Sequence, residues 1–186
     1  GYVGGAFTGA RKDGKPGLFE TAHNGTLFLD EVGEMARNCQ ARILRVIQEN
    51  TVRRIGGAEE IPVHVRIITA THRDLNEMVR EGGFRRDLFY RINVLPIHIP
   101  PLRERSPDIP LFAEHFLFGL AARVDEPVKP LTPEALDKMY RHDWPGNVRE
   151  LKNVVERAAI LNAGDRITAA DILFSHEMRS ASNGSP

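Results

Sequence analysis

Residues 25–31 read GTLFLDE, a short apolar run that ends in two adjacent acids, Asp30 and Glu31. This run predicts a strand that is buried on both faces, as in a parallel sheet. Ligands of open parallel sheets bind beyond the carboxyl ends of the strands, which is where these two acids lie. Asp30 could hold a hydrated Mg²⁺ ion while Glu31 orients an attacking water. The alternative interpretation is that both acids are solvated residues at the end of a strand.

Further strands and helices surround this run. Residues 41–48 carry a stripe of mostly apolar side chains at helical spacing and predict an amphipathic helix. Residues 52–65 carry a glycine pair between β-branched runs and predict a hairpin, residues 65–71 predict a second core strand, and residues 93–99 predict a third. Strands that alternate with helices indicate an α/β fold with a parallel sheet.

After Pro100-Pro101 the pattern becomes helical. Helices are predicted over residues 109–124, after the cap Thr132, and after the WPG tripeptide at 144–146, where Asn147 is the expected N-cap and Glu150 completes a capping box. We therefore expect an α/β part over residues 1–104, a small all-helical lid over residues 105–174, and a disordered tail over residues 175–186.

Composition excludes several classes of protein. The 186 residues carry 25 basic and 25 acidic side chains, so the overall charge gives no indication of nucleic-acid binding. Cys39 is the only cysteine, no leader peptide is recognisable, and no apolar run reaches membrane-spanning length. We expect a cytoplasmic protein without a membrane segment and without a DNA-binding domain in this chain.

One segment imitates a phosphate-binding loop. Residues 9–15 match the P-loop spacing up to Lys15, but the next residue is Pro16, which has no hydroxyl for Mg²⁺. No apolar strand precedes Gly9, and too few residues separate Lys15 from Asp30 for the usual helix and strand. We therefore reject this segment as a P-loop.

Four motifs carry a resemblance to a known family. GAFTGA at residues 5–10, GTLFLDE at 25–31, FRRDLFYRI at 84–92 and WPGNVREL at 144–151 follow one another in the family's order. The chain resembles, up to about Phe174, the AAA+ domain of bacterial enhancer-binding proteins, the NtrC-like sigma-54-dependent transcription activators. The fold implied is a partial AAA+ parallel sheet with flanking helices, followed by a small all-α lid subdomain, in an N-terminally truncated form of the domain.

The resemblance implies an ATPase that assembles into a homo-oligomeric ring and remodels the closed complex of sigma-54 and RNA polymerase. It implies ATP and Mg²⁺ as cofactors, with Asp30 and Glu31 as the Walker B pair. The loop implied to contact sigma-54 consists of Gly5, Ala6, Phe7, Thr8, Gly9 and Ala10. Its glycines allow Phe7 and Thr8 to project on a mobile tip, where an exposed phenylalanine can anchor in a partner. The alternative is a Phe7 folded back onto its own core.

The resemblance also assigns roles to several other residues. Arg85 and Arg91 match the two arginines that reach into the neighbouring subunit's site, a task suited to a permanently charged, forked side chain. Thr71 resembles sensor I, and Arg149 resembles the sensor II arginine that contacts nucleotide in its own subunit. The alternatives are a solvated arginine, as we expect for Arg86, and for Arg149 an ion pair on the helix surface with Glu156 or Glu126.

One residue departs from the family pattern, because His72 stands where Asn is common, and a lone histidine is more often structural than catalytic. Without a P-loop, this chain is expected to be inactive by itself, as a fragment of the activator or as a degenerate protein. The alternative function is a non-hydrolysing module that binds sigma-54 or takes part in ring assembly.

Overall fold

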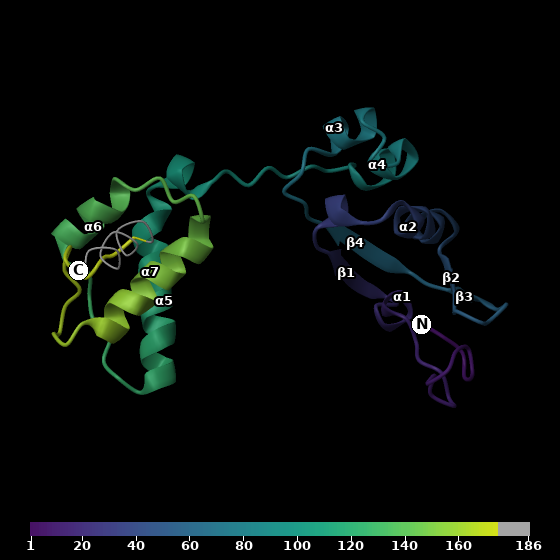
Figure 1. Cartoon of the computed structure of the whole chain (residues 1–186), viewed down its shortest axis with the longest axis horizontal. Coiled ribbons are helices and arrows are strands. Elements are labelled where there is room, and N and C mark those ends of the chain that lie inside the picture. Colours follow the sequence, from purple (N-terminus) through teal and green to yellow (C-terminus); the bar gives the residue numbers. More distant parts are fainter. Residues whose placement is uncertain (175–186) are drawn as a thin grey trace, which may run out of the picture. The chain divides into compact units, whose positions relative to one another are not determined.

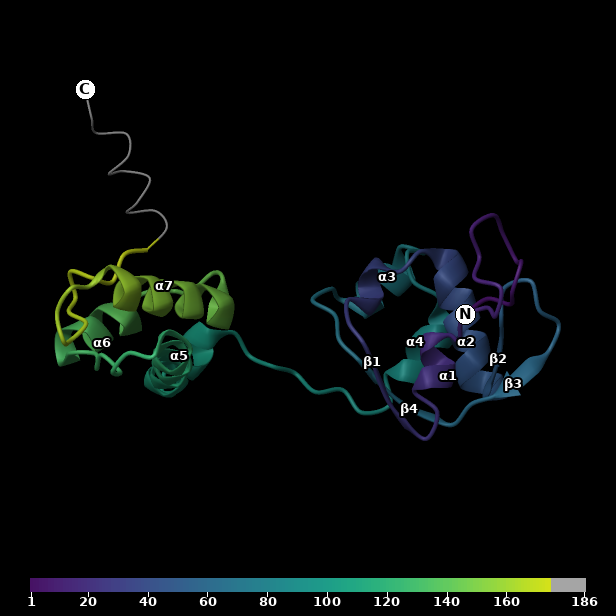
Figure 2. The same ribbon diagram turned by 90° about the horizontal axis from the view of Figure 1, so that it is seen from below.

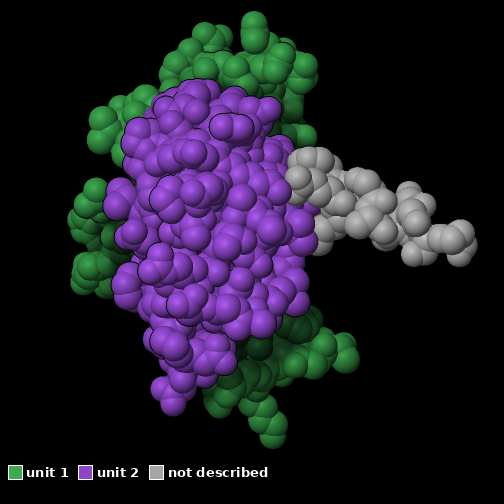
Figure 3. Space-filling model, turned by 90° about the vertical axis from the view of Figure 1, so that its left-hand side faces the viewer, with its two compact units in different colours: residues 1–97 green, residues 98–186 purple. Residues whose placement is uncertain are grey.

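The computed structural model describes residues 1–174, which form two compact units. The first unit is Gly1–Ile97 and the second begins at His98 (Figure 3). The expected tail over residues 175–186 lies outside the described residues. No helix within residues 1–174 combines the length and the apolar character needed to cross a bilayer.

The first unit contains a pair of parallel strands, β1 (Gly25–Leu29) and β4 (Val65–Thr69), which lie side by side in Figure 1. Their register pairs Leu27 with Ile67 and Phe28 with Ile68. Because side chains alternate along a strand, Leu27 shares a half-buried face with Ile67, while Phe28 and Ile68 are exposed on the other face. The parallel pairing is confirmed, but the prediction that the first strand is buried on both faces is wrong for the described residues.

Helices α2 (Arg37–Glu49), α3 (Leu75–Arg80) and α4 (Arg86–Ile92) build the core of this unit. The unit also contains a short helix before β1, α1 (Leu18–Thr21), and a 3-10 turn after it, η1 (Val32–Glu34). The predicted amphipathic helix is α2, whose apolar stripe contacts α4. Its end at Asn50 has a left-handed backbone, the usual way to stop a helix. The buried residues of this core are Leu44, Phe84, Leu88 and Phe89.

The predicted hairpin is confirmed as β2 (Thr51–Arg53) and β3 (Glu60–Pro62), which pair antiparallel. The predicted strand over residues 93–99 is wrong, because this segment is irregular and pairs with no described strand. Val94, Leu95 and Ile97 are about four-fifths exposed. A strand depends on hydrogen bonds to a neighbour, so apolar β-branched residues alone do not create one.

The second unit is helical, with a 3-10 turn, η2 (Leu102–Arg105), followed by α5 (Asp108–Val124), α6 (Pro133–Tyr140) and α7 (Asn147–Leu161). In both views α5 and α7 lie side by side (Figure 1, Figure 2). Trp144 belongs to the core that these helices share; it is fully buried and donates its indole N–H to the Met139 carbonyl oxygen at 2.9 Å. This single core makes the unit a compact helical bundle.

The helix starts in this unit were largely foreseen. Thr132 caps α6 by accepting a hydrogen bond from the Ala135 amide at 3.3 Å. The expected cap of α7 is wrong by one residue, since Gly146 is the N-cap and donates its N–H to Glu150. The Asn147 side chain instead accepts the Leu102 amide at 2.8 Å, which ties α7 to η2. Asn147 is therefore committed to a tertiary contact that local sequence does not reveal.

Candidate functional site

The carboxyl ends of β1 and β4 bring together the residues that follow each strand. Register pairs Leu29 with Thr69, so Asp30 and Glu31 emerge beside Thr71 and His72. Two further backbone bonds continue the pairing, from the Ala70 amide to the Leu29 oxygen and from the Val32 amide to the Ala70 oxygen. The structure thus gathers at one sheet edge the acidic pair and the two residues that follow the second strand.

Glu31 is the most constrained residue at this edge. It adopts a left-handed backbone with φ of 53°, and its amide donates to the Asp30 carboxylate at 3.0 Å. Such a conformation is uncommon for a residue with a side chain and is often found at functional turns. The turn directs the Glu31 carboxylate towards the His72 ring, 2.7 Å from Nδ1 to Oε2.

His72 joins the turn after β4 to the turn after β1. Its Nε2 lies 3.7 Å from the Glu34 carboxylate, which also forms an ion pair with Arg73 at 3.0 Å. Both Glu31 and His72 are more than half exposed, so water has access to the Glu31 carboxylate. Sequence reasoning treated His72 as a structural residue and missed this contact. The available signal was its position directly after the presumed sensor threonine.

Thr71 takes a different place from His72. Its hydroxyl accepts the Arg73 amide at 3.1 Å and lies against Gly33, where an added Cβ would approach it to 2.7 Å. Thr71 therefore braces the acidic turn, and no described hydrogen bond joins its side chain to Asp30 or Glu31.

The side-chain amide of the buried Gln40 positions Arg85. Arg85 is the N-cap of α4, and its backbone N–H donates to Oε1 of Gln40 at 2.9 Å. Its guanidinium donates to both oxygens of the Asp87 carboxylate, at 3.0 and 2.7 Å. This pairing lowers the pKa of Asp87 and raises the pKa of Arg85, so both groups stay charged.

Arg91 lies further along the same helix and has different partners. Its Nη2 is 3.5 Å from the Ile47 carbonyl oxygen on α2, a weak contact at the limit of a hydrogen bond. No described contact links Arg85 or Arg91 to Asp30 or Glu31. Within this chain the two arginines do not join the acidic pair.

The GAFTGA loop is closed at its base and open at its tip. Tyr2 and Lys15 exchange two backbone hydrogen bonds, of 2.9 and 2.8 Å. Gly5 and Gly9 have φ of 73° and 91°, values that suit glycine, with no neighbouring atoms near an added Cβ. Phe7 is 52% exposed while its ring meets Tyr2 edge-on at 4.9 Å. It is thus presented on the surface and is also supported from one side.

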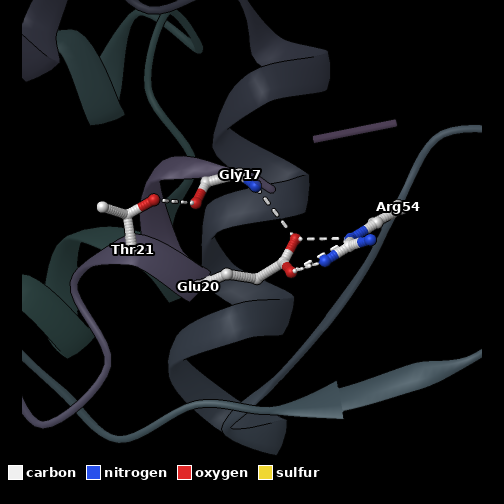
Figure 4. A network of polar contacts seen from close by, with 4 residues as sticks. All are labelled: Gly17, Glu20, Thr21 and Arg54. Atoms are coloured by element: carbon white, nitrogen blue, oxygen red, sulfur yellow. Dashed lines mark hydrogen bonds and ion pairs between the residues drawn. The ribbon is translucent and has the colours of Figure 1, made fainter. Parts of the chain in front are cut away.

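A second contact links the segment after this loop to the β2–β3 hairpin. Glu20 accepts the Gly17 amide at 2.9 Å, and both of its carboxylate oxygens accept hydrogen bonds from the Arg54 guanidinium (Figure 4). The Arg54 hydrogen bonds hold the pKa of Glu20 below its ordinary value. The Glu20 side chain is only 10% exposed, so this ion pair is partly sheltered from water. The loop and the hairpin therefore share a polar anchor.

Two remaining predictions concern residues away from the acidic turn. Residues 9–15, the P-loop imitation, fold as a surface loop closed by the Tyr2–Lys15 pair rather than as a strand, loop and helix. Arg149 lies exposed in the first turn of α7 and has no ion pair among the described residues. Glu156, one expected partner, is paired with Arg123 at 3.1 Å.

The fold and the sheet-edge residues define the class of the protein. A solved structure of RuvB from Thermotoga maritima, 16% identical, matches with a TM-score of 0.54 over 88% of this chain and 47% of that one, a likeness of fold alone. The structure of NtrX from Brucella abortus has a TM-score of 0.84 and 39% identity over 94% of this chain and 40% of that chain. NtrX was also crystallised with ADP and with ATP. This is an AAA+ fold.

The family models and the relatives identify a narrower group within the proteins of this fold. Residues 1–98 match the model of the sigma-54 interaction domain, and residues 103–185 match that of the AAA+ ATPase lid domain. The chain is 51% identical to the transcriptional regulatory protein ZraR of Salmonella typhimurium over 92% of its length, and 52% identical to the Nif-specific regulatory protein of Herbaspirillum seropedicae over 90%. This chain belongs to the family of AAA+ sigma-54-dependent activators. It spans 39% of ZraR and 31% of the Nif-specific regulator.

Proposed function

We propose that this chain is part of a sigma-54-dependent transcriptional activator whose ATP hydrolysis remodels the closed complex of sigma-54 RNA polymerase in the cytoplasm. The observation that carries the proposal is the combination of the exposed GAFTGA loop with an acidic turn held at the carboxyl ends of two parallel strands. Such a turn is where open parallel sheets bind ligands. The family match supports ATP as the ligand of this turn.

The acidic turn suits water activation on a nucleotide. Asp30 is exposed and offers a carboxylate for a hydrated Mg²⁺ ion, which keeps several waters and needs few protein oxygens. When bound, Mg²⁺ would neutralise charge on the phosphates. Glu31, oriented by His72, would accept a proton from the attacking water and align it. Thr71 fixes the geometry of the turn, and Arg149 would contact nucleotide within the same subunit.

Arg85 and Arg91 are proposed to act on the nucleotide of a neighbouring subunit in a homo-oligomeric ring. Their guanidiniums lie on α4, without a described contact to this chain's own acidic pair. A permanently charged fork that is supplied by another subunit can stabilise phosphate charge in the transition state. Because no segment of this chain has the residues of a P-loop, we propose that the chain by itself does not hydrolyse ATP.

Complementation of a disabled relative tests this role. ZraR would be produced with both arginines that align with Arg85 and Arg91 replaced by glutamine. This change would leave its nucleotide-binding pockets in place but remove the arginines that a neighbouring subunit supplies to them. Adding this chain should restore ATP hydrolysis, and adding the R85Q chain should not. The R42Q chain is the matched control, with the same charge change on the exposed surface of α2. Hydrolysis by this chain alone that is abolished by E31Q would contradict the proposal.

Binding to sigma-54 tests the loop. Phe7→Ala should abolish the interaction of the chain with purified sigma-54 in a titration, whereas Leu18→Ala removes an even more exposed apolar side chain elsewhere and should leave it intact. Sigma-54 binding without any restoration of hydrolysis would favour the alternative, a non-hydrolysing module for sigma-54 binding or ring assembly. Equal losses of sigma-54 binding in both variants would show that the interaction does not depend on this loop.

A further inference from the structure

The outer side of α5 is apolar although it faces solvent. Leu111 is 67% exposed and Phe118 is 60% exposed, and His115 and Ala122 are exposed as well. These four residues, which we call the outer stripe, follow one another at spacings of four, three and four and so lie along one side of the helix. The only polar residues of α5 are Asp108, Glu114, His115 and Arg123. A helix that is apolar on all sides is normally buried, so the outer stripe has the composition of an interface.

The outer stripe is complementary to a second copy of itself. Its spacing is that of the contact between two helices of a coiled coil. If two α5 helices pack antiparallel about a two-fold axis between residues 116 and 117, Leu111 of each copy faces Ala122 of the other, and His115 faces Phe118. A large side chain then meets a small one at each end, and two rings meet at each inner position. An added Cβ on Gly119 would have no atom within 4 Å, so the backbone beside Phe118 is open to close approach.

The charged residues near the two ends of α5 favour the antiparallel direction. In a parallel pair, Asp108 would lie near Asp108 of the second copy and Arg123 near Arg123, so like charges would meet. In the antiparallel pair, Asp108 of each copy lies near Arg123 of the other. The ion pair of Asp108 with Arg105 is long, at 3.8 Å, and the Arg123 side chain is 62% exposed while its Nη2 contacts Glu156. Both residues can therefore reach a second copy, and charge complementarity selects one arrangement.

We infer that the outer stripe of α5 binds a second copy of this chain, with the two α5 helices antiparallel about a two-fold axis. The stripe runs from residue 111 to residue 122, which is about 16 Å of helix. Such a contact buries less than the roughly 800 Å² per partner of a stable interface, so the dimer should form at high protein concentration only. A two-fold contact differs from the head-to-tail contacts that build a ring, so the inference goes beyond the proposed function and does not depend on it.

Disulfide formation between single-cysteine variants tests the arrangement. Cys39, the only cysteine of the chain, is first replaced by serine in every variant. Chains that carry L111C are mixed with ¹⁵N-labelled chains that carry A122C in a glutathione redox buffer, and mass spectrometry separates mixed from like disulfides. The mixed disulfide should exceed the L111C–L111C disulfide at least tenfold. The two Leu111 positions of an antiparallel pair lie about 16 Å apart, whereas the Cα atoms of a disulfide lie within about 7 Å of each other.

A matched control and a second measurement accompany the disulfide test. L161C takes the place of A122C as the control, because Leu161 is 71% exposed in the same unit but lies on α7, outside the outer stripe. Sedimentation equilibrium over a hundredfold range of concentration then measures the dimer directly. F118Q should weaken it at least fivefold, and L161Q should stay within twofold of wild type. The fluorescence of Trp144 verifies that the second unit of each variant is folded, since Trp144 lies in its core.

The results separate the inference from its alternatives. L111C chains that cross-link to one another as readily as to A122C chains overturn it, because the pair is then parallel or random. Equal yields with A122C and L161C also overturn it, since they show collision only. Wild-type dimerisation in F118Q has the same consequence, as does an equal loss in L161Q, which shows general apolar association. None of these measurements involves ATP or sigma-54, so a failure here leaves the proposed function standing, and a failure of the complementation leaves this contact standing.

Discussion

Gln40 is the residue whose replacement tests most directly how this fold holds Arg85. It is fully buried on α2 and makes three hydrogen bonds. Nε2 donates to the Met35 and Gly83 carbonyl oxygens at 2.8 and 3.1 Å, and Oε1 accepts the Arg85 amide at 2.9 Å. One side chain thus ties a residue before the start of α2 to two residues of the segment that leads into α4.

Gln40→Met keeps the size and the unbranched shape of the side chain but removes all three bonds. Each buried hydrogen bond contributes about 1 kcal/mol net, so the free energy of unfolding of the first unit should fall by about 3 kcal/mol. The cost arises because three partly buried backbone groups lose their partner. With a urea dependence of about 2 kcal/mol per molar, the midpoint should drop by about 1.5 M.

Urea unfolding followed by far-ultraviolet circular dichroism measures this change. Trp144, the only tryptophan, lies in the second unit, so its fluorescence separately follows the unfolding of that unit. Gln48→Met is the matched control, since Gln48 is exposed on the same helix, and it should change the free energy of unfolding by less than about 0.5 kcal/mol. A Q40M midpoint indistinguishable from that of Q48M would refute the assignment of these bonds as stabilising.

Three further predictions concern other parts of the chain. Because Arg54 holds the pKa of folded Glu20 below its ordinary 4.5, the Glu20 carboxylate stabilises the fold above about pH 4.5, and this contribution is lost as the pH falls through the folded pKa. Urea midpoints measured from pH 7 to pH 3 should therefore fall more steeply for wild type than for E20Q, and parallel profiles would contradict this. Gly33→Ala should destabilise the first unit by about 1–3 kcal/mol, because the new Cβ would approach the Thr71 hydroxyl to 2.7 Å; unchanged thermal unfolding would show that the turn yields freely. Leu151→Ala should cost about 2–5 kcal/mol in the second unit, read from tryptophan fluorescence, since Leu151 is fully buried in its core; a loss below 1 kcal/mol would argue against that core.

Much of the fold was predictable because it rests on local patterns. Helical spacing located α2 and α5, the glycine pair located the β2–β3 hairpin, and Thr132 marked the start of α6. The predictions failed where a distant partner decides the outcome. Residues 93–99 have strand-forming side chains but no described neighbour to pair with, and Asn147 is drawn away from capping by the Leu102 amide.

The sequence by itself determined the family and the identity of the acidic pair, because GAFTGA and GTLFLDE are contiguous motifs whose residue types carry the chemistry. Only the tertiary structure decided which side chains meet. It placed His72 on the carboxylate of Glu31, 41 residues away in the chain, through the register of two parallel strands. It also set Arg37 beside Arg85 and Arg86 by packing the start of α2 against α4. Such contacts depend on strand pairing and helix packing between segments far apart in the chain, which no local pattern encodes.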